Sequence, residues 1–578
     1  MKRRAAQADT AAMSSYRWRS ALVLGLVLAC AAGLSVRALE LQWLDRPFLA
    51  KQGDERTMRV AKIIAHRGAI TDRNGEPLAL STPVDTVWVN PQEINENIDE
   101  VPRLAKALKQ EPQSLVRRVT SNLDREFLYL ARHMPPEQAA RIKALGIPGV
   151  YLLREYRRYY PAGEVSGHLV GFTTVDDQGQ EGLELGFDQV LDGENGAKRV
   201  IQDLYGRSVQ NVESIRAPRP GRDLTTSIDL RIQYLAYREL KAAMQEYRAR
   251  AGSVVVIDVG TGEVLAMVNQ PTYNPNDRDQ IKAGLYRNRA ATDIFEPGSS
   301  IKPFVIAAAL ESGQWRPDSV VDTAPGFLKV GTKVFEDEHP LGTIDIATIL
   351  AKSSNVGMLK IALSLKPEQI WHTLTALGFG QVTGGGYPGE SAGMLSHYSH
   401  WRPIGIATLS HGYGLSVTPL QLAHAYATIG AGGVSRPISF ERVTGPVPGA
   451  QVIPRNVANS LVQLMESVVN AEGATGKRAA VVGYRVAGKT GTAWKSTAGG
   501  YSTDRYMAVF GGVVPATRPK LATVVVIDEP SGKLFYGGEV AAPVFSSVMT
   551  GALRLMDVPP DDLQNVPATT LVQSNDGP

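Results

Sequence analysis

Three short sequence motifs that lie far apart along the chain place the strongest constraint on its fold. They are Ser299-Ser300-Ile301-Lys302, Ser353-Ser354-Asn355 and Lys489-Thr490-Gly491-Thr492, and their first residues are separated by 54 and then 136 residues. Each motif alone is short enough to arise by chance in a chain of 578 residues. Their occurrence in this order is much harder to obtain by accident, and it predicts a fold that brings the three segments to one site.

The first motif has the residue types of an activated serine nucleophile. A serine hydroxyl needs an adjacent base, and on a helix Lys302 lies one turn from Ser299 on the same face. A lysine accepts a proton only after losing its own, so burial or a cationic neighbour must lower its pKa. Glu296-Pro297-Gly298 predicts a turn that delivers Ser299 to a helix N-terminus, where its N–H can bind a developing oxyanion. Pro303 predicts an irregular first turn, and the alternative for this motif alone is a buried helix with a capping serine.

The second motif follows an apolar helical segment at residues 344–351. Serine and asparagine are ordinary helix-capping residues, so this motif alone needs no function. In the functional interpretation, Ser353 passes a proton to a leaving amine and Asn355 donates a hydrogen bond to a substrate amide.

The third motif follows residues 484–487, which the sequence predicts to be a strand. Gly491 allows another backbone to come close, as expected for a strand against which a substrate lies. In the functional interpretation, Lys489 supplies positive charge, Thr490 a hydroxyl group, and Thr492 a backbone N–H as the second oxyanion donor. A strand end without function is the alternative for this motif in isolation.

In this order, the motifs resemble those of the penicillin-interacting acyl transferases, in which a serine attacks a peptide or β-lactam carbonyl. Over residues 40–556 the chain resembles a class B penicillin-binding protein, most closely the cell-division (FtsI-type) peptidoglycan transpeptidases. Further segments carry this resemblance: Arg67 to Gly75, Arg157 to Gly163, Glu181 to Glu184, Thr226 to Asp229 and Gly412 to Leu415.

The resemblance implies a D,D-transpeptidase that cross-links peptidoglycan stem peptides at their D-Ala-D-Ala ends during septal wall synthesis, and that β-lactams inhibit covalently. It assigns the nucleophile to Ser299 and the general base to Lys302. It also implies catalytic or substrate-binding roles for Ser353, Asn355, Lys489, Thr490, Gly491, Thr492 and Tyr413. His411 departs from the family, because division enzymes usually carry tyrosine there. A histidine that lines the cleft would change charge between about pH 5 and 8, whereas a packing histidine would not.

Other functions fit some of these features. The departure at His411 leaves open a specialised paralogue of the division enzyme with a conditional role. A β-lactamase uses the same motifs but adds a base that activates water, and we find no glutamate placed as in the class A enzymes. A β-lactam receptor would add several membrane helices and a cytoplasmic effector. A catalytically idle division scaffold would tolerate loss of the motifs, yet all three are intact.

Composition narrows the function classes further. With 61 basic and 57 acidic residues, nothing points to nucleic-acid binding. The nine histidines are dispersed and no Cys and His residues are spaced as metal ligands, so no metal or organic cofactor is implied. Cys30 is the single cysteine, which excludes an intramolecular disulfide.

An uncharged segment of 17 residues, Ser20 to Val36, predicts the compartment. It is just long enough to cross a bilayer as a helix, for which about 17–25 residues are needed. Basic residues precede it at Lys2, Arg3, Arg4, Arg17 and Arg19. We therefore expect a cytoplasmic tail at residues 1–19, a single-pass anchor in the bacterial inner membrane at residues 20–37, and a periplasmic catalytic domain. Cleavage beside Cys30, as in a signal peptide or a lipoprotein, is the alternative.

The outer part of the chain divides in two, and the predicted fold class is α+β. Residues 57–220 mix short β-like and polar helical stretches, and by resemblance they form an elongated, non-catalytic pedestal. Residues 221–556 open with a predicted hairpin, insert helices and close with strands, which predicts a transpeptidase domain with an antiparallel sheet flanked by helices. Residues 557–578 are polar and Pro-rich, which predicts a disordered tail. No room precedes the pedestal for a glycan-polymerising domain, so the resemblance implies a membrane glycosyltransferase partner (FtsW-like) and other division proteins.

Overall fold

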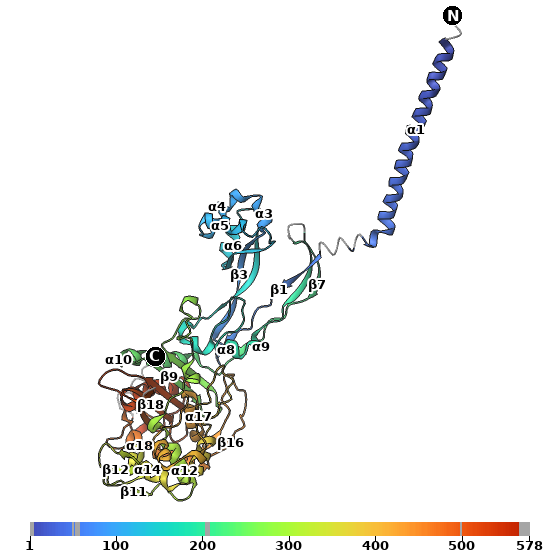
Figure 1. Cartoon of the computed structure of the whole chain (residues 1–578). Coiled ribbons are helices and arrows are strands. Elements are labelled where there is room, and N and C mark those ends of the chain that lie inside the picture. Colours follow the sequence, from blue (N-terminus) through green and yellow to red (C-terminus); the bar gives the residue numbers. More distant parts are fainter. Residues whose placement is uncertain (1–4, 49–50, 52–57, 203–207, 498–499, 566–578) are drawn as a thin grey trace, which may run out of the picture. The chain divides into compact units, whose positions relative to one another are not determined.

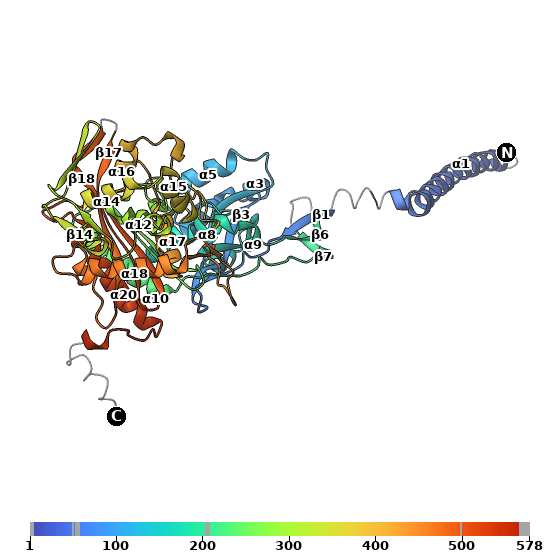
Figure 2. The same ribbon diagram turned by 90° about the horizontal axis from the view of Figure 1, so that it is seen from below.

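The computed structural model describes residues 5–48, 51, 58–202, 208–497 and 500–565. The chain folds into two compact units. The first unit contains residues 1–65, 84–155 and 194–219, and the second contains residues 66–83, 156–193 and 220–578. Figures 1 and 2 show their helices and strands in two views.

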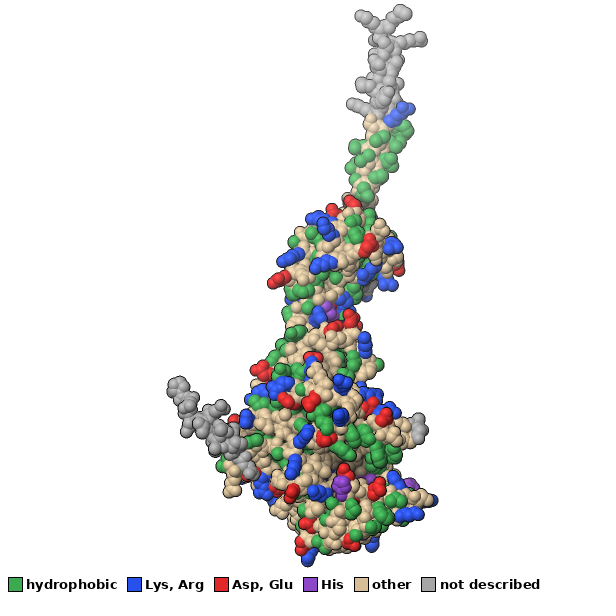
Figure 3. All heavy atoms as spheres, turned by 90° about the vertical axis from the view of Figure 1, so that its left-hand side faces the viewer, with side chains coloured by type: hydrophobic (Ala, Val, Ile, Leu, Met, Phe, Trp, Pro, Cys, Tyr) green, Lys and Arg blue, Asp and Glu red, His purple; other side chains and the backbone are tan. Residues whose placement is uncertain are grey.

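The first described element is a long apolar helix, α1 (Ala5–Leu39), which continues into the π-helix η1 (Glu40–Leu44). Within the described residues it is the one helix that is long and apolar enough to cross a membrane, over Trp18–Leu44 with a mean hydropathy of 2.2. None of this stretch is buried in the protein, and apolar side chains cover much of it in Figure 3. The helix contains the predicted anchor of residues 20–37 and is consistent with a single membrane span.

Two groups of strands belong to the first unit. The strands β1 (Met58–Ile63), β6 (Gly196–Gln202) and β7 (Ser208–Arg216) form an antiparallel sheet in the order β1-β6-β7. In the second group, the end of β3 (Pro77–Val89) pairs with β4 (Leu128–Met134), and β5 (Val150–Tyr159) also pairs with β3.

Short helices pack on one face of this second group of strands. They are α3 (Pro91–Asn95), α4 (Val101–Leu108), α5 (Pro112–Thr120) and α6 (Pro136–Lys143). Val87 and Val89 point to the same side of β3, because side chains alternate along a strand. They form a core with Leu104 of α4 and Leu115 of α5. The predicted mixture of strands and helices in this part of the chain is therefore confirmed.

A buried ion network ties two early segments of the second unit together. Glu184 is fully buried, and its Oε2 accepts a hydrogen bond from Arg67 Nε at 2.6 Å. Its Oε1 accepts one from Arg158 Nε, also at 2.6 Å. Because these buried charges compensate one another, removal of one partner leaves an uncompensated charge away from water.

The central sheet of the second unit is antiparallel throughout, in the order β10-β9-β19-β18-β17. Its strands are β9 (Ala251–Asp258), β10 (Val264–Gln270), β17 (Ala487–Thr497), β18 (Gly500–Val514) and β19 (Leu521–Asp528). The predicted opening hairpin and late strands fall within these elements. Since β17 stands last in the order, its outer edge has no neighbouring strand among the described residues.

Helices cover both faces of this sheet. Helices α10 (Leu230–Glu246) and α20 (Ala542–Leu555) pack on one face. Helices α17 (Pro419–Gly430) and α18 (Arg455–Asn470) lie on the other face. Val254 and Val256 of β9 join the core with α10 and α20, whereas Val255 and Ile257 join the core with α17. The alternation along β9 thus serves two cores at once. The predicted α+β arrangement of an antiparallel sheet flanked by helices is confirmed.

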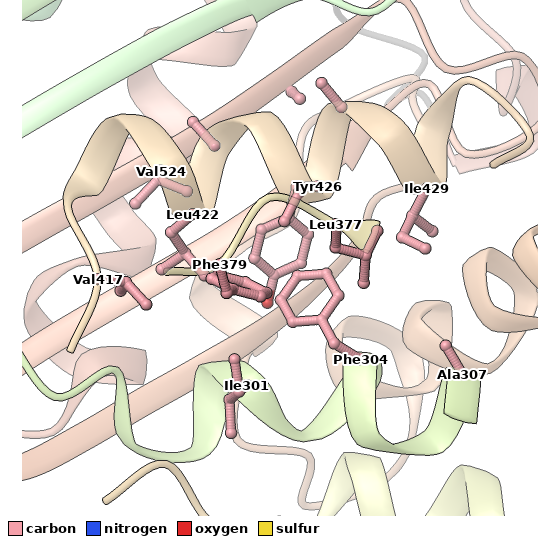
Figure 4. Packing of buried hydrophobic residues seen from close by; sticks show 14 of the residues in the cluster. Ile301, Phe304, Ala307, Leu377, Phe379, Val417, Leu422, Tyr426, Ile429 and Val524 are labelled. Carbon is pink, nitrogen blue, oxygen red and sulfur yellow. The ribbon is translucent and has the colours of Figure 1, made fainter. Parts of the chain in front are cut away.

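Helix α12 (Lys302–Glu311) is buried on every side, as its apolar sequence predicts. Phe304 packs against Phe379 and Tyr426, with ring centroids 5.3 and 5.1 Å away (Figure 4). Tyr426 of α17 also donates a hydrogen bond from Oη to the carbonyl oxygen of Ser300 at 2.9 Å. The first motif is therefore held in place by the hydrophobic core.

Short helices and strands connect α12 to α17. They are β11 (Val320–Asp322), β12 (Phe327–Val330), β13 (Lys333–Glu336), β14 (Thr343–Asp345), α13 (Ile346–Ala351), α14 (Asn355–Ser364), α15 (Pro367–Ala376) and α16 (Pro403–Leu409). The strands form two antiparallel pairs, β11 with β14 and β12 with β13. The second motif lies in this part of the chain, where α13 ends and α14 begins.

The start of the predicted disordered tail is ordered. Val558 accepts a hydrogen bond from Tyr484 Oη at 2.6 Å. Asp561 accepts hydrogen bonds from Arg485 N at 2.8 Å and from Thr517 Oγ1 at 2.7 Å. The prediction of disorder from residue 557 is wrong for this stretch, because its polar groups find partners on the catalytic unit that composition cannot reveal. Residues 566–578 lie outside the described residues.

Replacing Glu184 by alanine should destabilise the folded chain by about 3–5 kcal/mol, because Arg158 would keep a buried charge without an acidic partner and Arg67 would keep only its pair with Asp188. The matched control is Glu213→Ala, which removes an exposed ion pair with Arg199 and should cost about 0–1 kcal/mol. Thermal unfolding of the two full-length variants measures the difference. Equal stability would contradict the importance of the buried network.

Candidate active site

The first motif forms a tight turn at the start of a buried helix. Gly298–Ile301 is a 3-10 turn, η5, and α12 follows it with Pro303 in its first turn. The irregular first turn that Pro303 predicts is therefore present. Ser299 lines a cavity of about 700 Å³, whereas Lys302 is completely buried.

Oxygen atoms of the second motif surround the amine of Lys302. Its Nζ donates hydrogen bonds to the carbonyl oxygens of Ser353 and Ser354, at 2.6 and 3.1 Å, and to Oδ1 of Asn355 at 2.9 Å. Burial lowers the pKa of Lys302 to about 7, although the negative charge of Asp337 opposes this. A large fraction of Lys302 is therefore neutral near pH 7 and able to accept a proton.

Ser353 lies between two buried lysines. Its Oγ is 3.3 Å from Lys302 Nζ and accepts a hydrogen bond from Lys489 Nζ at 3.0 Å. The backbone of Ser353 has φ = 60°, in the left-handed region, which costs a residue other than glycine about 1–3 kcal/mol. In this conformation both the carbonyl and the hydroxyl oxygen of Ser353 approach Lys302. The strained backbone of Ser353 thus accompanies the placement of two of its oxygen atoms against Lys302.

Lys489 is also completely buried. Its Nζ donates hydrogen bonds to the carbonyl oxygen and Oγ1 of Thr490 at 3.1 and 3.2 Å. Burial, followed by the nearby charge of Lys302, holds the pKa of Lys489 well below 10.5. A positive charge on Lys302 therefore opposes a second positive charge on Lys489.

The second motif joins α13 to α14. Ser354 is the N-cap of α14, and its Oγ accepts a hydrogen bond from Gly357 N at 2.9 Å. Helix capping, the ordinary explanation of this motif, is therefore correct for Ser354. It coexists with the contacts that the residues on either side make to Lys302.

The third motif lies on β17, the edge strand of the central sheet. A Cβ atom on Gly491 would lie 2.7 Å from the carbonyl oxygen of Pro297 and 3.1 Å from Ser300 N. The close backbone that Gly491 accommodates is thus the turn that carries Ser299, where the sequence had suggested a substrate. Among the described residues no strand pairs with the outer edge of β17, and an extended peptide that adds to a sheet does so at such an edge.

All three motifs meet at the same cavity. Its lining includes Ser299, Ser353, Asn355, Thr490 and Thr492. Charged side chains also line it, among them Asp337, Glu338, Lys352, Lys477 and Glu539. In the part of the chain that the structure describes, no group of three or more His, Cys, Asp or Glu side chains could hold a metal ion. The arrangement can activate a serine beside a neutral lysine.

Tyr413 is not among the residues that line this cavity. Its Oη accepts a hydrogen bond from the backbone N–H of Trp494 on β17 at 3.1 Å. Its ring also contacts Tyr501, with centroids 5.2 Å apart. Tyr413 therefore braces β17 just after the third motif, and direct contact with a substrate stays a prediction.

His411 is buried, with its ring centroid 5.1 Å from that of Phe335. Burial, and then the positive charges of Lys302 and Lys333, lower the pKa of His411 to about 3. The ring therefore stays neutral between pH 5 and 8. Of the two alternatives for His411, the structure favours packing over a change of charge in this range.

Asp337 is a member of the site that the sequence analysis missed. Its Oδ2 accepts a hydrogen bond from Ser354 Oγ at 2.8 Å, and its Oδ1 accepts one from Asn355 N at 2.5 Å. Helix caps usually come from the residue directly before the helix. Asp337 reaches α14 from a different element, so no local pattern could have indicated its contact.

Comparison with known proteins identifies the family. Residues 252–550 match the penicillin binding protein transpeptidase domain, and residues 62–226 match the penicillin-binding protein dimerisation domain. The chain is 43% identical over 551 residues to the peptidoglycan D,D-transpeptidase FtsI of Escherichia coli (strain K12), covering 94% of this chain and 93% of that relative. The chain belongs to the FtsI family of class B penicillin-binding proteins. It is a peptidoglycan D,D-transpeptidase.

Further relatives of this penicillin-binding protein agree with its fold. The probable peptidoglycan D,D-transpeptidase PbpC of Pseudomonas aeruginosa is 40% identical over 559 residues, which is 96% of this chain and 99% of that relative. The solved structure of penicillin-binding protein 3 from Mycobacterium tuberculosis with aztreonam is 27% identical, covers 86% of this chain and 98% of its own, and has a TM-score of 0.67. The transpeptidase domain of Burkholderia pseudomallei penicillin-binding protein 3 is 40% identical, covers 58% of this chain and 97% of its own, and has a TM-score of 0.54.

Replacing Gly491 by alanine in this penicillin-binding protein should slow covalent labelling by a fluorescent penicillin about tenfold or more. The added Cβ would press on the turn that carries Ser299, and misplacement by ~1 Å can cost about 10²-fold in rate. The matched control is Gly284→Ala, since nothing lies within 4 Å of a Cβ added at Gly284. Equal labelling rates for the two variants would show that the close contact at Gly491 is unimportant.

Proposed function

We propose that Ser299 is the nucleophile of a transpeptidase that cross-links peptidoglycan stem peptides during septal wall synthesis. The observation that carries this proposal is the complete burial of Lys302, whose pKa falls to about 7. A lysine with this pKa, one helical turn from a serine at a cavity, can activate that serine near neutral pH.

In the first half of the proposed reaction, Ser299 Oγ attacks the carbonyl carbon of the penultimate D-Ala, and Lys302 takes the hydroxyl proton. The backbone N–H groups of Ser299 and Thr492 bind the oxyanion of the tetrahedral intermediate. As the C–N bond breaks, the proton passes from Lys302 through Ser353 to the leaving nitrogen. The products are free D-Ala and an acyl-enzyme ester on Ser299.

In the second half, an amine of a neighbouring stem peptide attacks the ester carbonyl. Lys302 takes a proton from this amine and returns it to Ser299 Oγ as the ester bond breaks. Asn355 donates a hydrogen bond to an amide of the bound stem peptide. One amide bond is thereby exchanged for another, and the step requires no cofactor.

We assign Lys489 and Thr490 to the terminal carboxylate of the stem peptide. A carboxylate beside Lys489 raises the pKa of that lysine, and so opposes the effects of burial and of the charge on Lys302. The proton that gives Lys489 its charge is then taken up together with the substrate. This reconciles the low pKa of Lys489 with its proposed role as a cation.

We propose three further properties of this chain, which concern its inhibitors, its domain boundaries and its partners. Penicillin-binding protein 3 of Mycobacterium tuberculosis has been solved in complex with aztreonam and with ampicillin, and we propose that β-lactams bind this chain and acylate Ser299. We propose residues 57–220 as the pedestal domain and residues 221–556 as the transpeptidase domain. An FtsW-like membrane glycosyltransferase and other division proteins are the proposed partners.

A specialised paralogue of the division enzyme is the second candidate function. FtsI of Escherichia coli and PbpC of Pseudomonas aeruginosa are 43% and 40% identical to this chain, so identity alone does not separate the two roles. His411 was the sequence feature that suggested a specialised role. Its packing against Phe335 gives it a structural explanation, which favours the septal function.

We propose that α1 crosses the bacterial inner membrane once, with its N-terminal end in the cytoplasm. Support comes from the basic residues before the apolar stretch, at Lys2, Arg3, Arg4, Arg17 and Arg19. Lysine and arginine near a membrane span favour the cytoplasmic side. The catalytic unit then lies in the periplasm, where peptidoglycan is cross-linked.

Treatment of the full-length protein with penicillin should give one stable covalent adduct, which should be absent from Ser299→Ala. Lys302→Ala should still bind the drug but acylate about 10²–10⁴-fold more slowly, because it lacks the general base. The adduct should persist, since the drug fragment keeps the acceptor amine away from the ester. Intact-protein mass spectrometry measures the adduct and its lifetime.

The same experiment separates a transpeptidase from a β-lactamase. Rapid loss of the adduct, with hydrolysed drug accumulating over many turnovers, would identify a β-lactamase. An adduct that survives in Ser299→Ala would place the nucleophile on another residue.

A fluorescent protein that also folds outside the cytoplasm, fused after Pro578, should be fluorescent and should collect at the division site of constricting cells. The positive-inside argument predicts an external C-terminus, and the proposed septal function predicts the site. A reporter that is active only in the cytoplasm, fused at the same position, is the control and should be inactive. An even distribution along the side wall would favour the specialised paralogue.

A further inference from the structure

The carboxylate of Asp337 binds the beginning of α14 from outside that helix. Its Oδ1 accepts hydrogen bonds from the backbone N–H groups of Asn355 and Val356, at 2.5 and 3.1 Å. Its Oδ2 accepts a hydrogen bond from Ser354 Oγ at 2.8 Å. A carboxylate at the N-terminus of a helix is stabilised by the helix dipole and by the unpaired N–H groups there. Asp337 is thus a second cap of α14, in addition to Ser354.

The hairpin of β12 and β13 delivers this carboxylate. Asp337 directly follows β13, and the carbonyl oxygen of Glu336 accepts a hydrogen bond from Asn355 Nδ2 at 3.0 Å. Phe335 on β13 is buried in a small cluster with Leu359 of α14 and Ala407 of α16. The hairpin therefore holds Asn355 by both its backbone N–H and its side-chain amide.

The opposite side of this segment contacts Lys302. The carbonyl oxygens of Ser353 and Ser354 and Oδ1 of Asn355 all accept hydrogen bonds from Lys302 Nζ. Asn355 thus accepts a hydrogen bond from Lys302 with its amide oxygen and donates one to the carbonyl oxygen of Glu336 with its amide nitrogen. Movement of the hairpin would therefore displace Asn355 and Ser354, two of the residues whose oxygen atoms accept hydrogen bonds from Lys302.

We infer that Asp337 is a positioning residue of the transpeptidase, which fixes Ser354 and Asn355 as acceptors for Lys302 and presents its own negative charge to that lysine. The inference rests on the proposed roles of Ser299 and Lys302. Asp337 itself makes no contact with the reacting atoms in this scheme.

Among the described residues, three titratable groups interact with Lys302 from the elements packed around it. Asp337 follows β13, Lys489 lies on β17, and His411 follows α16. Burial lowers the pKa of both His411 and Lys489, and His411 is neutral. The anion among the three is Asp337, whose charge raises the pKa of Lys302 and so opposes the effect of burial. Loss of this charge should lower the pKa of Lys302.

The test is the pH dependence of penicillin acylation by full-length Asp337→Asn in detergent micelles. Asparagine keeps the shape of the side chain, its oxygen can still accept from the two backbone N–H groups, and its amide can donate to Ser354 Oγ. The charge is lost, and the hydrogen bond between this side chain and Ser354 Oγ reverses its direction. The acidic limb of the rate profile should move to lower pH by roughly one pH unit, since an opposite charge nearby shifts a pKa by about 1–3 units. The rate at high pH should change less than about threefold.

Two further variants separate charge from position. Asp337→Ala removes all three hydrogen bonds and should lower the high-pH rate by roughly 10- to 100-fold, because the acceptors around Lys302 move. Asp345→Asn is the matched control: Asp345 caps the neighbouring helix α13 through a 2.8 Å hydrogen bond from Thr348 N. It should leave both the limb and the high-pH rate as in the parent.

The outcomes are decisive in either direction. A profile of Asp337→Asn that superimposes on that of the parent, or an equal shift in Asp345→Asn, would overturn the inference. A lower rate at every pH without a moved limb would also overturn it, because a merely structural role predicts that result. Acylation of the parent chain at Ser299 tests the proposed function separately, so failure of one is distinguished from failure of the other.

Discussion

Burial of the Lys302 amine is the interaction on which the rest of the site depends. Removal from water lowers its pKa to about 7, and an unpaired buried charge would cost the fold several kcal/mol. Three oxygen acceptors from Ser353, Ser354 and Asn355 offset this cost. The same surroundings therefore stabilise the protonated lysine through hydrogen bonds and, by excluding water, lower its pKa enough for it to act as a base. Ser353, whose carbonyl oxygen is one of these acceptors, adopts a left-handed backbone conformation.

The need to bury Lys302 also explains how closely the surrounding elements approach. Gly491 lets β17 contact the turn before α12, since any side chain there would meet the backbone of Pro297. Tyr426 binds the same turn from α17. Asp337 closes the opposite side by capping α14. Each contact comes from a different part of the sequence, so the site is stable only once the whole catalytic unit has folded.

Much of the fold and the site could be predicted because the relevant signals are local. The apolar segments at residues 253–258 and 523–527 lie within β9 and β19, and the uninterrupted apolar sequence after Lys302 gave a helix buried on every side. Other features depend on partners that are distant in sequence. His411 packs on Phe335 and stays neutral, and Asp561 binds Arg485 and Thr517 instead of lying in a disordered tail. A side chain's type does not reveal which distant group will surround it.

The sequence by itself determined which chemistry the protein can perform, because the residue types and the order of the three motifs require a serine, a lysine and their helpers. It also determined the α+β class, since the apolar pattern follows the periods of helices and strands. The tertiary structure alone decided that Lys302 loses its charge near neutral pH, that Gly491 serves the Ser299 turn, and that Asp337 belongs to the site. The physical reason is that pKa values, close backbone contacts and remote helix caps depend on what surrounds a residue in space. The chain acquires those surroundings only when it folds.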